Sequence, residues 1–186
     1  GRRVGRPLKE NQAERLDAGL AQFGLTLVDL EQATSLDSGP DSGSDSGPDS
    51  RVGSGLGTLF PHAPKELWLE IGFGGGEHLA YQAAQNPQVG VIGAEFFANG
   101  VSSACGHLLR AALTNARLLH GDGRELLDRL PDNSMTRVFI LHPDPWPKKR
   151  HHERRIVNTD TLDALARVMV SGGELRLATD HASYKP

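Results

Sequence analysis

The feature that most constrains the fold is a short apolar run that ends in a loop of glycines. Residues 67–71 form an apolar run of strand length, and residues 72–76 read Gly-Phe-Gly-Gly-Gly. Residues 77–85 then have helical character. A strand, a glycine loop and a helix in this order are typical of the opening unit of a nucleotide-binding α/β fold.

Strand-length apolar runs and helical stretches alternate through the rest of the chain. Near-continuous apolar strands separated by helices favour a parallel sheet that is covered on both faces. We therefore expect a Rossmann-like, doubly wound, mostly parallel α/β sheet. The predicted strands after the first are 89–94, 116–120, 135–141 and 174–179, with a turn at 171–173, and the predicted helices are 98–113, 124–130 and 159–170.

The segment before this α/β domain has two parts of different composition. Residues 11–23 carry apolar side chains at helical spacing, with Gly24 as a C-cap, and we expect 25–30 to be extended. Ser, Asp, Gly and Pro then dominate, and such a composition buries too little apolar surface to offset the entropy of ordering. The predicted division is a basic arm and short helix over 1–33, a disordered linker or insertion over 34–58, and the α/β domain over 59–186.

Charge and cysteine content limit the classes of function. The net charge is −3, so attraction to nucleic acid has to come from a local basic patch. Cys105 is the single cysteine, which excludes an internal disulfide and a cysteine-based zinc site and fits a reducing cytoplasm. The sequence has neither a run of about eighteen apolar residues nor a hydrophobic signal core, so we expect no membrane span and no secretion.

Acidic residues recur at the ends of the predicted strands. In open parallel sheets the ligand lies beyond the carboxyl ends of the strands, near the point where the strand order reverses. One acid at such a position is uninformative, whereas five around a glycine loop indicate a polar, charged ligand. The five are Glu70, Glu95, Asp122, Asp144 and Asp180.

The glycine loop suits close approach of a bound molecule. Gly72, Gly74 and Gly76 can adopt positive φ values and carry no side chain that would collide with a ligand. Glu95 lies roughly twenty residues beyond the loop, where an acid accepts hydrogen bonds from ribose hydroxyls. These features fit a dinucleotide and S-adenosylmethionine equally well.

The charges near the loop separate these two ligands. A pyrophosphate would be repelled by Glu70 and Glu77. S-adenosylmethionine carries an ammonium and a sulfonium, and its adenine offers an amino donor to Asp122. The acids therefore favour S-adenosylmethionine.

Residues 142–155 combine an aspartate on a restricted backbone, an aromatic ring and a basic run. Pro143 and Pro145 restrict the backbone on both sides of Asp144, which would lie where a methyl acceptor binds. Trp146 offers a surface on which a base can stack. Such alignment matters because methyl transfer is an in-line displacement.

The basic part of this stretch is suited to phosphates. Four cations of this stretch would hold the phosphates of a nucleic acid: Lys148, Arg150, Arg154 and Arg155. The two adjacent histidines, His151 and His152, are more typical of an RNA-facing or solvated surface than of a metal site. We therefore expect no metal.

Three segments together resemble the bacterial tRNA (guanine-N7-)-methyltransferase family, which belongs to the class I S-adenosylmethionine-dependent methyltransferases. They are 69–77 (Leu-Glu-Ile-Gly-Phe-Gly-Gly-Gly-Glu), 93–95 (Gly-Ala-Glu) and 143–152 (Pro-Asp-Pro-Trp-Pro-Lys-Lys-Arg-His-His). The resemblance runs from about residue 67 to residue 184 and implies methylation of N7 of a guanine in the variable loop of tRNA. The family's closing strands would lie beyond Pro186, so we expect 59–186 to be a C-terminally truncated methyltransferase domain.

The resemblance also implies roles for individual residues. Asp144 would be catalytic, and S-adenosylmethionine would contact Glu70, Glu95, Asp122 and Asp144. Lys148 and Asp180 would contact the substrate, and residues 150–155 would bind RNA.

Three other functions remain open on the sequence alone. A non-catalytic RNA-binding relative would keep the basic run without turnover. A dinucleotide-dependent oxidoreductase would share the glycine loop and Glu95 but has no use for the Pro-Asp-Pro-Trp segment. An amino-methyltransferase of DNA or RNA would use an acid after the fourth strand to bind an exocyclic amine.

Overall fold

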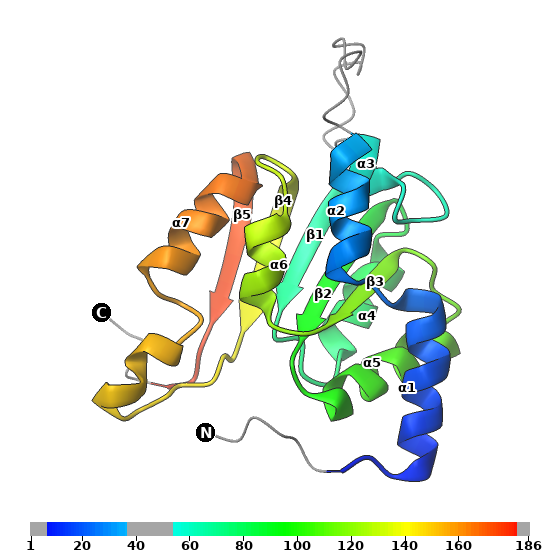
Figure 1. Cartoon of the computed structure of the whole chain (residues 1–186), viewed down its shortest axis with the longest axis horizontal. Helices are drawn as coiled ribbons and strands as arrows, with labels where there is room; N and C mark the ends of the chain where they lie inside the picture. The colour runs from blue at the N-terminus through cyan, green and yellow to red at the C-terminus, as the bar shows by residue number, and fades with distance from the viewer. Residues whose placement is uncertain (1–6, 37–53, 182–186) are drawn as a thin grey trace.

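The computed structural model describes residues 7–36 and 54–181, and Figure 1 shows its arrangement. The basic residues of the N-terminal arm up to Arg6 and the core of the predicted linker, 37–53, lie outside the described residues. The predicted fold class is confirmed, because the described chain forms one five-stranded sheet in which every neighbouring pair is parallel.

The strand order of the sheet is β3-β2-β1-β4-β5. The chain runs outward from β1 to β3 and then crosses back to place β4 on the other side of β1. The order therefore reverses between β1 and β4, which is where open α/β sheets bind ligands. The strands are β1 (Glu66–Ile71), β2 (Val89–Glu95), β3 (Ala116–His120), β4 (Met135–Leu141) and β5 (Met169–Ala178).

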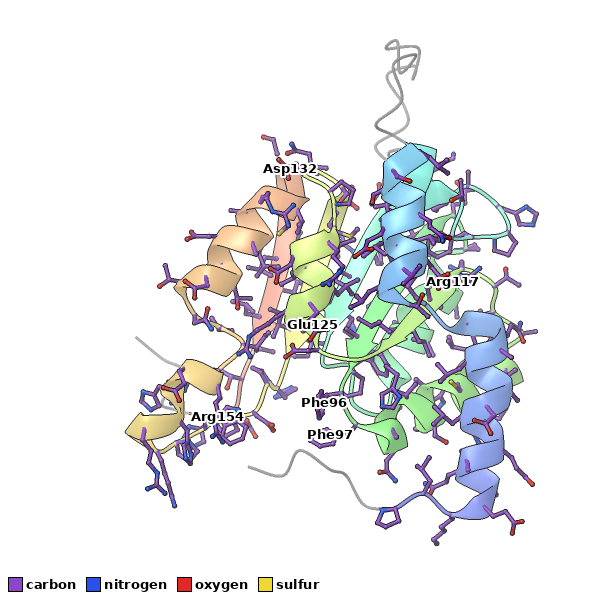
Figure 2. All side chains as sticks on the ribbon, in the orientation of Figure 1. Phe96, Phe97, Arg117, Glu125, Asp132 and Arg154 are labelled. Carbon is purple, nitrogen blue, oxygen red and sulfur yellow. The ribbon has the colours of Figure 1, made fainter. Side chains whose placement is uncertain are left out.

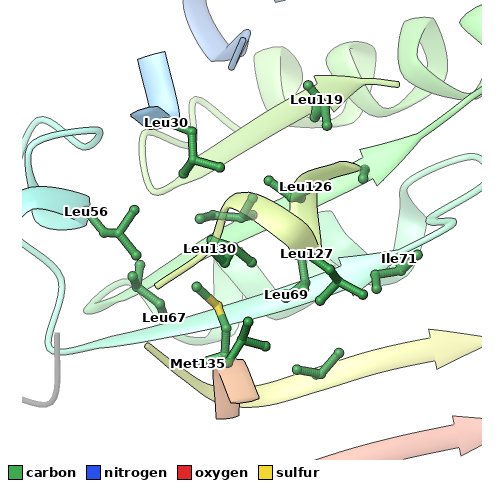
Figure 3. Packing of buried hydrophobic residues seen from close by; sticks show 14 of the residues in the cluster. Leu30, Leu56, Leu67, Leu69, Ile71, Leu119, Leu126, Leu127, Leu130 and Met135 are labelled. Carbon is green, nitrogen blue, oxygen red and sulfur yellow. The ribbon is translucent and has the colours of Figure 1, made fainter. Parts of the chain in front are cut away.

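Helices cover both faces of the sheet and divide the core in two. Successive strand residues point to opposite faces, so Leu67 and Leu69 enter one core while Trp68 enters the other. The first core packs under α2 (Leu27–Ser35), α3 (Ser54–Gly57), α6 (Gly123–Arg129) and α7 (Thr159–Val168), and Figure 3 shows its leucine-rich packing. The second packs under α1 (Glu10–Phe23), α4 (Glu77–Gln85) and α5 (Ala98–Arg110).

The predicted extended segment 25–30 is wrong, because α2 begins at Leu27. Thr26 caps this helix: its hydroxyl accepts from the Asp29 N–H at 3.1 Å, and the Asp29 carboxylate accepts from the Thr26 N–H at 2.8 Å. This reciprocal pair satisfies two helix-end donors. The extended backbone is limited to the residues just before it, where the Leu25 N–H donates to the Leu118 carbonyl of β3.

Ordered structure enters both ends of the range predicted as a linker. Helix α2 continues to Ser35, and α3 begins at Ser54. Leu56 is fully buried in the core beneath α2 and α3. Burial of this leucine explains why the chain is ordered there despite the Gly- and Ser-rich sequence around it.

The predicted turn at 171–173 is an irregularity inside β5. Met169 pairs with Met135, and the next pair along is Glu174 with Arg137, so β5 contains extra residues at this point. Gly172 has φ +78°, a value that favours glycine and lets the strand resume its register.

Candidate active site

A pocket of about 850 Å³ opens at the carboxyl ends of the strands, around the reversal of strand order. Every segment that follows β1 to β4 contributes to it. The residues that line it are Ile71, Gly72, Gly74, Ala94, Glu95, Phe96, Phe97, Gly100, Gly121, Asp122, Gly123, Arg124, His142, Pro143, Asp144, Trp146, Arg154 and Ile156. Of the five predicted strand-end acids, the structure brings Glu95, Asp122 and Asp144 into this lining.

Two glycines of the loop after β1 form one wall of the pocket. Gly72 has φ +72° and Gly74 has φ +55°, both in the region that residues with a Cβ rarely adopt. A Cβ built at either position would meet no atom within 4 Å. The backbone here is therefore open to the pocket, and a bound molecule can approach it closely.

Glu95 fastens this loop to the end of β2. One carboxylate oxygen accepts from the Gly74 N–H at 2.9 Å, and the other accepts from the Phe97 N–H at 2.9 Å. Each oxygen of a carboxylate has a second lone pair. Glu95 can therefore hold the loop in shape and still accept a hydrogen bond from a ligand.

Asp122 is the N-cap of α6. Its Oδ1 accepts from the Arg124 N–H at 2.9 Å, which fixes the carboxylate at the pocket edge after β3. The acids at the ends of β2 and β3 are thus both held by backbone donors. Such fixed acceptors suit hydroxyl and amino groups of a nucleoside.

Glu70 lies beneath the glycine loop, outside the pocket lining. It shares the sheet face of Trp68, is 3% exposed, and forms a hydrogen bond with His78 Nδ1 at 2.8 Å. Burial raises the pKa of Glu70, and the hydrogen bond with His78 opposes that rise. His78 in turn packs against Phe139 of β4, so the pair anchors α4 to the sheet.

The loop after β4 presents Asp144 to the pocket on an unusual backbone. Asp144 is exposed and lines the pocket. His142 has φ +51° and Trp146 has φ +37°, so residues with a Cβ adopt left-handed conformations on both sides of it. Sparsely populated conformations of this kind persist only where the surroundings hold them, and they concentrate at functional sites.

Trp146 is packed between two side chains of the basic segment. The Arg154 guanidinium lies 5.2 Å from the Trp146 ring centroid, and the His151 ring meets it edge-on with centroids 5.8 Å apart. Partial desolvation, followed by the charges of Arg154 and Arg150, lowers the pKa of His151. His151 therefore favours its neutral form and serves as a packing partner of Trp146.

The basic run forms the short 3-10 helix η2 (Lys149–Arg154), beside the pocket. Lys148, Arg150, His152 and Arg154 are exposed, and Arg154 also lines the pocket. Arg155 differs, because it is half-buried and its Nε donates to the Pro145 carbonyl at 3.0 Å.

Asp180 is exposed beyond β5 and does not line the pocket.

Phe96, Phe97 and Arg124 are among the pocket residues that the sequence analysis did not predict. Phe96 and Phe97 follow β2, with their rings 5.6 Å apart, and Phe96 is 48% exposed at the pocket. Figure 2 shows them at the end of β2 and Arg154 on the separate basic segment. Two aromatics directly after a strand-end acid were the available signal for them, whereas nothing in the sequence singled out Arg124.

Among residues 7–36 and 54–181, no three His, Cys, Asp or Glu side chains gather so that they could hold a metal ion. No helix within the same ranges combines the length and apolarity needed to cross a bilayer.

Several tRNA (guanine-N(7)-)-methyltransferases are similar in sequence to this chain. A family described as putative methyltransferases matches residues 64–186. The tRNA (guanine-N(7)-)-methyltransferase of Paramagnetospirillum magneticum is 55% identical over 127 residues, which cover 68% of this chain and 53% of that protein. The proteins of the same name from Rhodospirillum rubrum and Ruegeria pomeroyi are 42% and 46% identical over 184 residues, or 99% of this chain.

The chain is shorter than these relatives. It covers 53% of the Paramagnetospirillum protein, 65% of the Rhodospirillum protein and 70% of the Ruegeria protein. The matches nevertheless include the glycine loop, the loop after β4 and the basic segment, and they confirm the resemblance predicted from those motifs. This chain belongs to the tRNA (guanine-N7-)-methyltransferase family.

Proposed function

We propose that this chain carries the cofactor pocket and the catalytic loop of an enzyme that methylates N7 of a guanine in the variable loop of tRNA. The observation that carries the proposal is that Glu95, Asp122 and Asp144 line one pocket beside an exposed basic segment. Membership of the family supports the choice of tRNA and of guanine N7. We place the protein in the cytoplasm, a reducing compartment that fits its single free cysteine, Cys105.

The pocket fits S-adenosylmethionine. The open backbone at Gly72 and Gly74 allows close approach, Glu95 would accept from the ribose hydroxyls, and Asp122 would accept from the adenine amino group. When bound, S-adenosylmethionine supplies a methyl group on a cationic sulfur. Glu70 and Gly76 border the same loop without lining the pocket, and we propose that they act on the cofactor through that loop.

Methylation of guanine N7 requires that N7 is aligned with the methyl carbon and that the positive charge developing on the purine is stabilised. N7 carries a lone pair and no proton, so its attack on the methyl carbon needs no general base. As the new N–C bond forms and the C–S bond breaks, the sulfur keeps the electron pair and the purine becomes positively charged. Asp144 would orient the guanine and stabilise this developing charge.

The basic segment is proposed to hold the tRNA backbone. Lys148, Arg150, His152 and Arg154 are exposed around η2 and would lie along phosphates. Contacts of this kind position the RNA and make binding salt-dependent, but they carry little sequence information. Asp180 remains a proposed substrate contact.

The position of the transferred methyl group tests the proposal. The chain is incubated with S-adenosylmethionine and a tRNA transcript, and the digested RNA is analysed by mass spectrometry. We expect 7-methylguanosine from the variable loop, and a transcript in which that guanine is replaced by adenine should accept no methyl group. A methyl group on an exocyclic nitrogen would assign the chain to the amino-methyltransferases instead, and tRNA binding without binding of S-adenosylmethionine would favour a non-catalytic relative.

Loss of two exposed arginines should weaken tRNA binding. For Arg150→Ala combined with Arg154→Ala, two lost phosphate contacts should lower the affinity roughly 10- to 50-fold at about 0.1 M salt and reduce the salt slope by about two. Filter binding across a salt series measures both quantities. Arg110→Ala is the matched control, because this exposed arginine ends α5 and neither belongs to η2 nor lines the pocket. An unchanged slope in the double variant would mean that η2 is ordinary protein surface.

A further inference from the structure

Arg124 connects the side of the pocket formed after β3 with the basic segment that follows β4. It lies in the first turn of α6, and its backbone N–H donates to Asp122. Its Nη2 donates to the backbone carbonyls of Arg154 and Arg155, each at 2.9 Å. One side chain thus ties the cofactor side of the pocket to a segment thirty residues further along the chain.

A further hydrogen bond connects Arg155 to the loop that carries Asp144. Arg155, whose carbonyl accepts from Arg124, donates from its Nε to the Pro145 carbonyl at 3.0 Å. Asn158 also donates to the Arg155 carbonyl, at 2.9 Å, and so holds the same peptide from the start of α7. Pro145 lies between Asp144 and Trp146, so the hydrogen-bonded path ends beside the proposed catalytic carboxylate.

The loop needs such support from outside. Prolines at 143, 145 and 147 have no N–H to donate, which limits the hydrogen bonds that the loop can make within itself. The left-handed backbone at His142 and Trp146 is unfavourable for residues with a Cβ and must be held by its surroundings. Arg155 provides such a donor to the Pro145 carbonyl, and Arg124 of α6 holds the Arg155 peptide.

We propose that Arg124 is a positioning residue for methyl transfer, which holds the Asp144 loop against the cofactor side of the pocket through Arg155. The kinetic consequence rests on the proposed function, whereas the structural consequence does not. Misplacement of a reacting group by about 1 Å can lower a rate by about 10²-fold. Loss of Arg124 should therefore lower kcat far more than it changes the KM for S-adenosylmethionine.

The position of the loop can be read from Trp146. The chain has two tryptophans, so Trp68→Phe leaves Trp146 as the only one. In that background, Arg124→Ala should raise the acrylamide quenching constant of Trp146, because Arg154 and His151 no longer pack against the ring. Arg129→Ala is the matched control, since Arg129 lies on the same helix and bonds Glu31 and the Glu125 carbonyl, away from the loop.

Activity supplies the second readout. Arg124→Ala should lower kcat about 10²-fold, and Arg124→Lys should recover part of the loss, because one ammonium can reach one of the two carbonyls. If Arg124→Ala does not fold, as judged by circular dichroism, Arg124→Lys decides by the same two measurements. Quenching and kcat equal to those of Arg129→Ala would overturn the proposal.

The two proposals fail in different ways. If the parent chain does not methylate tRNA, the proposed function fails for this chain, and the quenching of Trp146 still tests the role of Arg124. If the parent is active and Arg124→Ala keeps both its rate and its quenching, the positioning role alone is wrong. A higher quenching constant in Arg124→Ala with the parental kcat would show that Arg124 holds the loop without aligning the reaction, which also overturns the proposal.

Discussion

Asp144→Ala is expected to lower the rate of methyl transfer by about 10²–10³-fold, the usual cost of removing one preorganised electrostatic group. Asp144 lies at the pocket on a loop whose backbone is restricted by two prolines. The methylated guanine becomes cationic, so a fixed carboxylate stabilises the transition state more than the ground state. Affinity for tRNA should change little, because the exposed arginines of η2 remain.

The isosteric change separates charge from shape. Asp144→Asn keeps the size and most of the hydrogen-bonding geometry but removes the negative charge, so it should lose nearly as much activity as Asp144→Ala. Single-turnover methyl transfer with radiolabelled S-adenosylmethionine measures the rate, and filter binding measures tRNA affinity. Asp128→Asn is the control, because this exposed acid of α6 does not line the pocket. Full activity in Asp144→Asn would show that the charge has no catalytic role.

The order of elements was predictable because each depends on local patterns. Apolar runs of strand length predict all five strands, and three of the acids at their ends line the pocket. The missed helix α2 had a local signal too, since a Thr followed three residues later by an acid is a capping pattern. Gly24 and Leu25 run extended against β3, so the predicted extended segment 25–30 holds only at its first residues, before α2 begins.

The roles of single polar residues were less predictable because they depend on contacts between distant segments. The strand-end position of Glu70 predicts a pocket acid, whereas the alternation of β1 turns its side chain toward α4, where it bonds His78. Arg155 looked like any other member of a basic run, although its guanidinium bonds the Pro145 carbonyl. Which arginine of a run turns inward is decided by tertiary structure and leaves no mark on sequence spacing.

Gly76→Ala is expected to lower the free energy of unfolding by about 2–5 kcal/mol, from backbone strain and overpacking together. Gly76 caps α4 with φ +81°, which costs about 1–2 kcal/mol for a residue with a Cβ. A Cβ there would also lie 2.3 Å from the Ala104 Cβ and 2.7 Å from the Ala104 Cα. Because a backbone atom is involved, α5 has to shift, and overpacking of this kind costs about 1–3 kcal/mol.

Gly72→Ala is the matched control for that change. Gly72 has a similar φ, +72°, but a Cβ there would meet no atom within 4 Å. Gly72→Ala therefore introduces the backbone strain without the overpacking. Urea denaturation followed by circular dichroism, without ligand, should therefore place Gly72→Ala between the parent and Gly76→Ala. Adding Ala104→Gly to Gly76→Ala should recover part of the loss, because it removes the nearer of the two clashing atoms. Equal losses for Gly72→Ala and Gly76→Ala would mean that close packing of the loop on α5 adds nothing to stability.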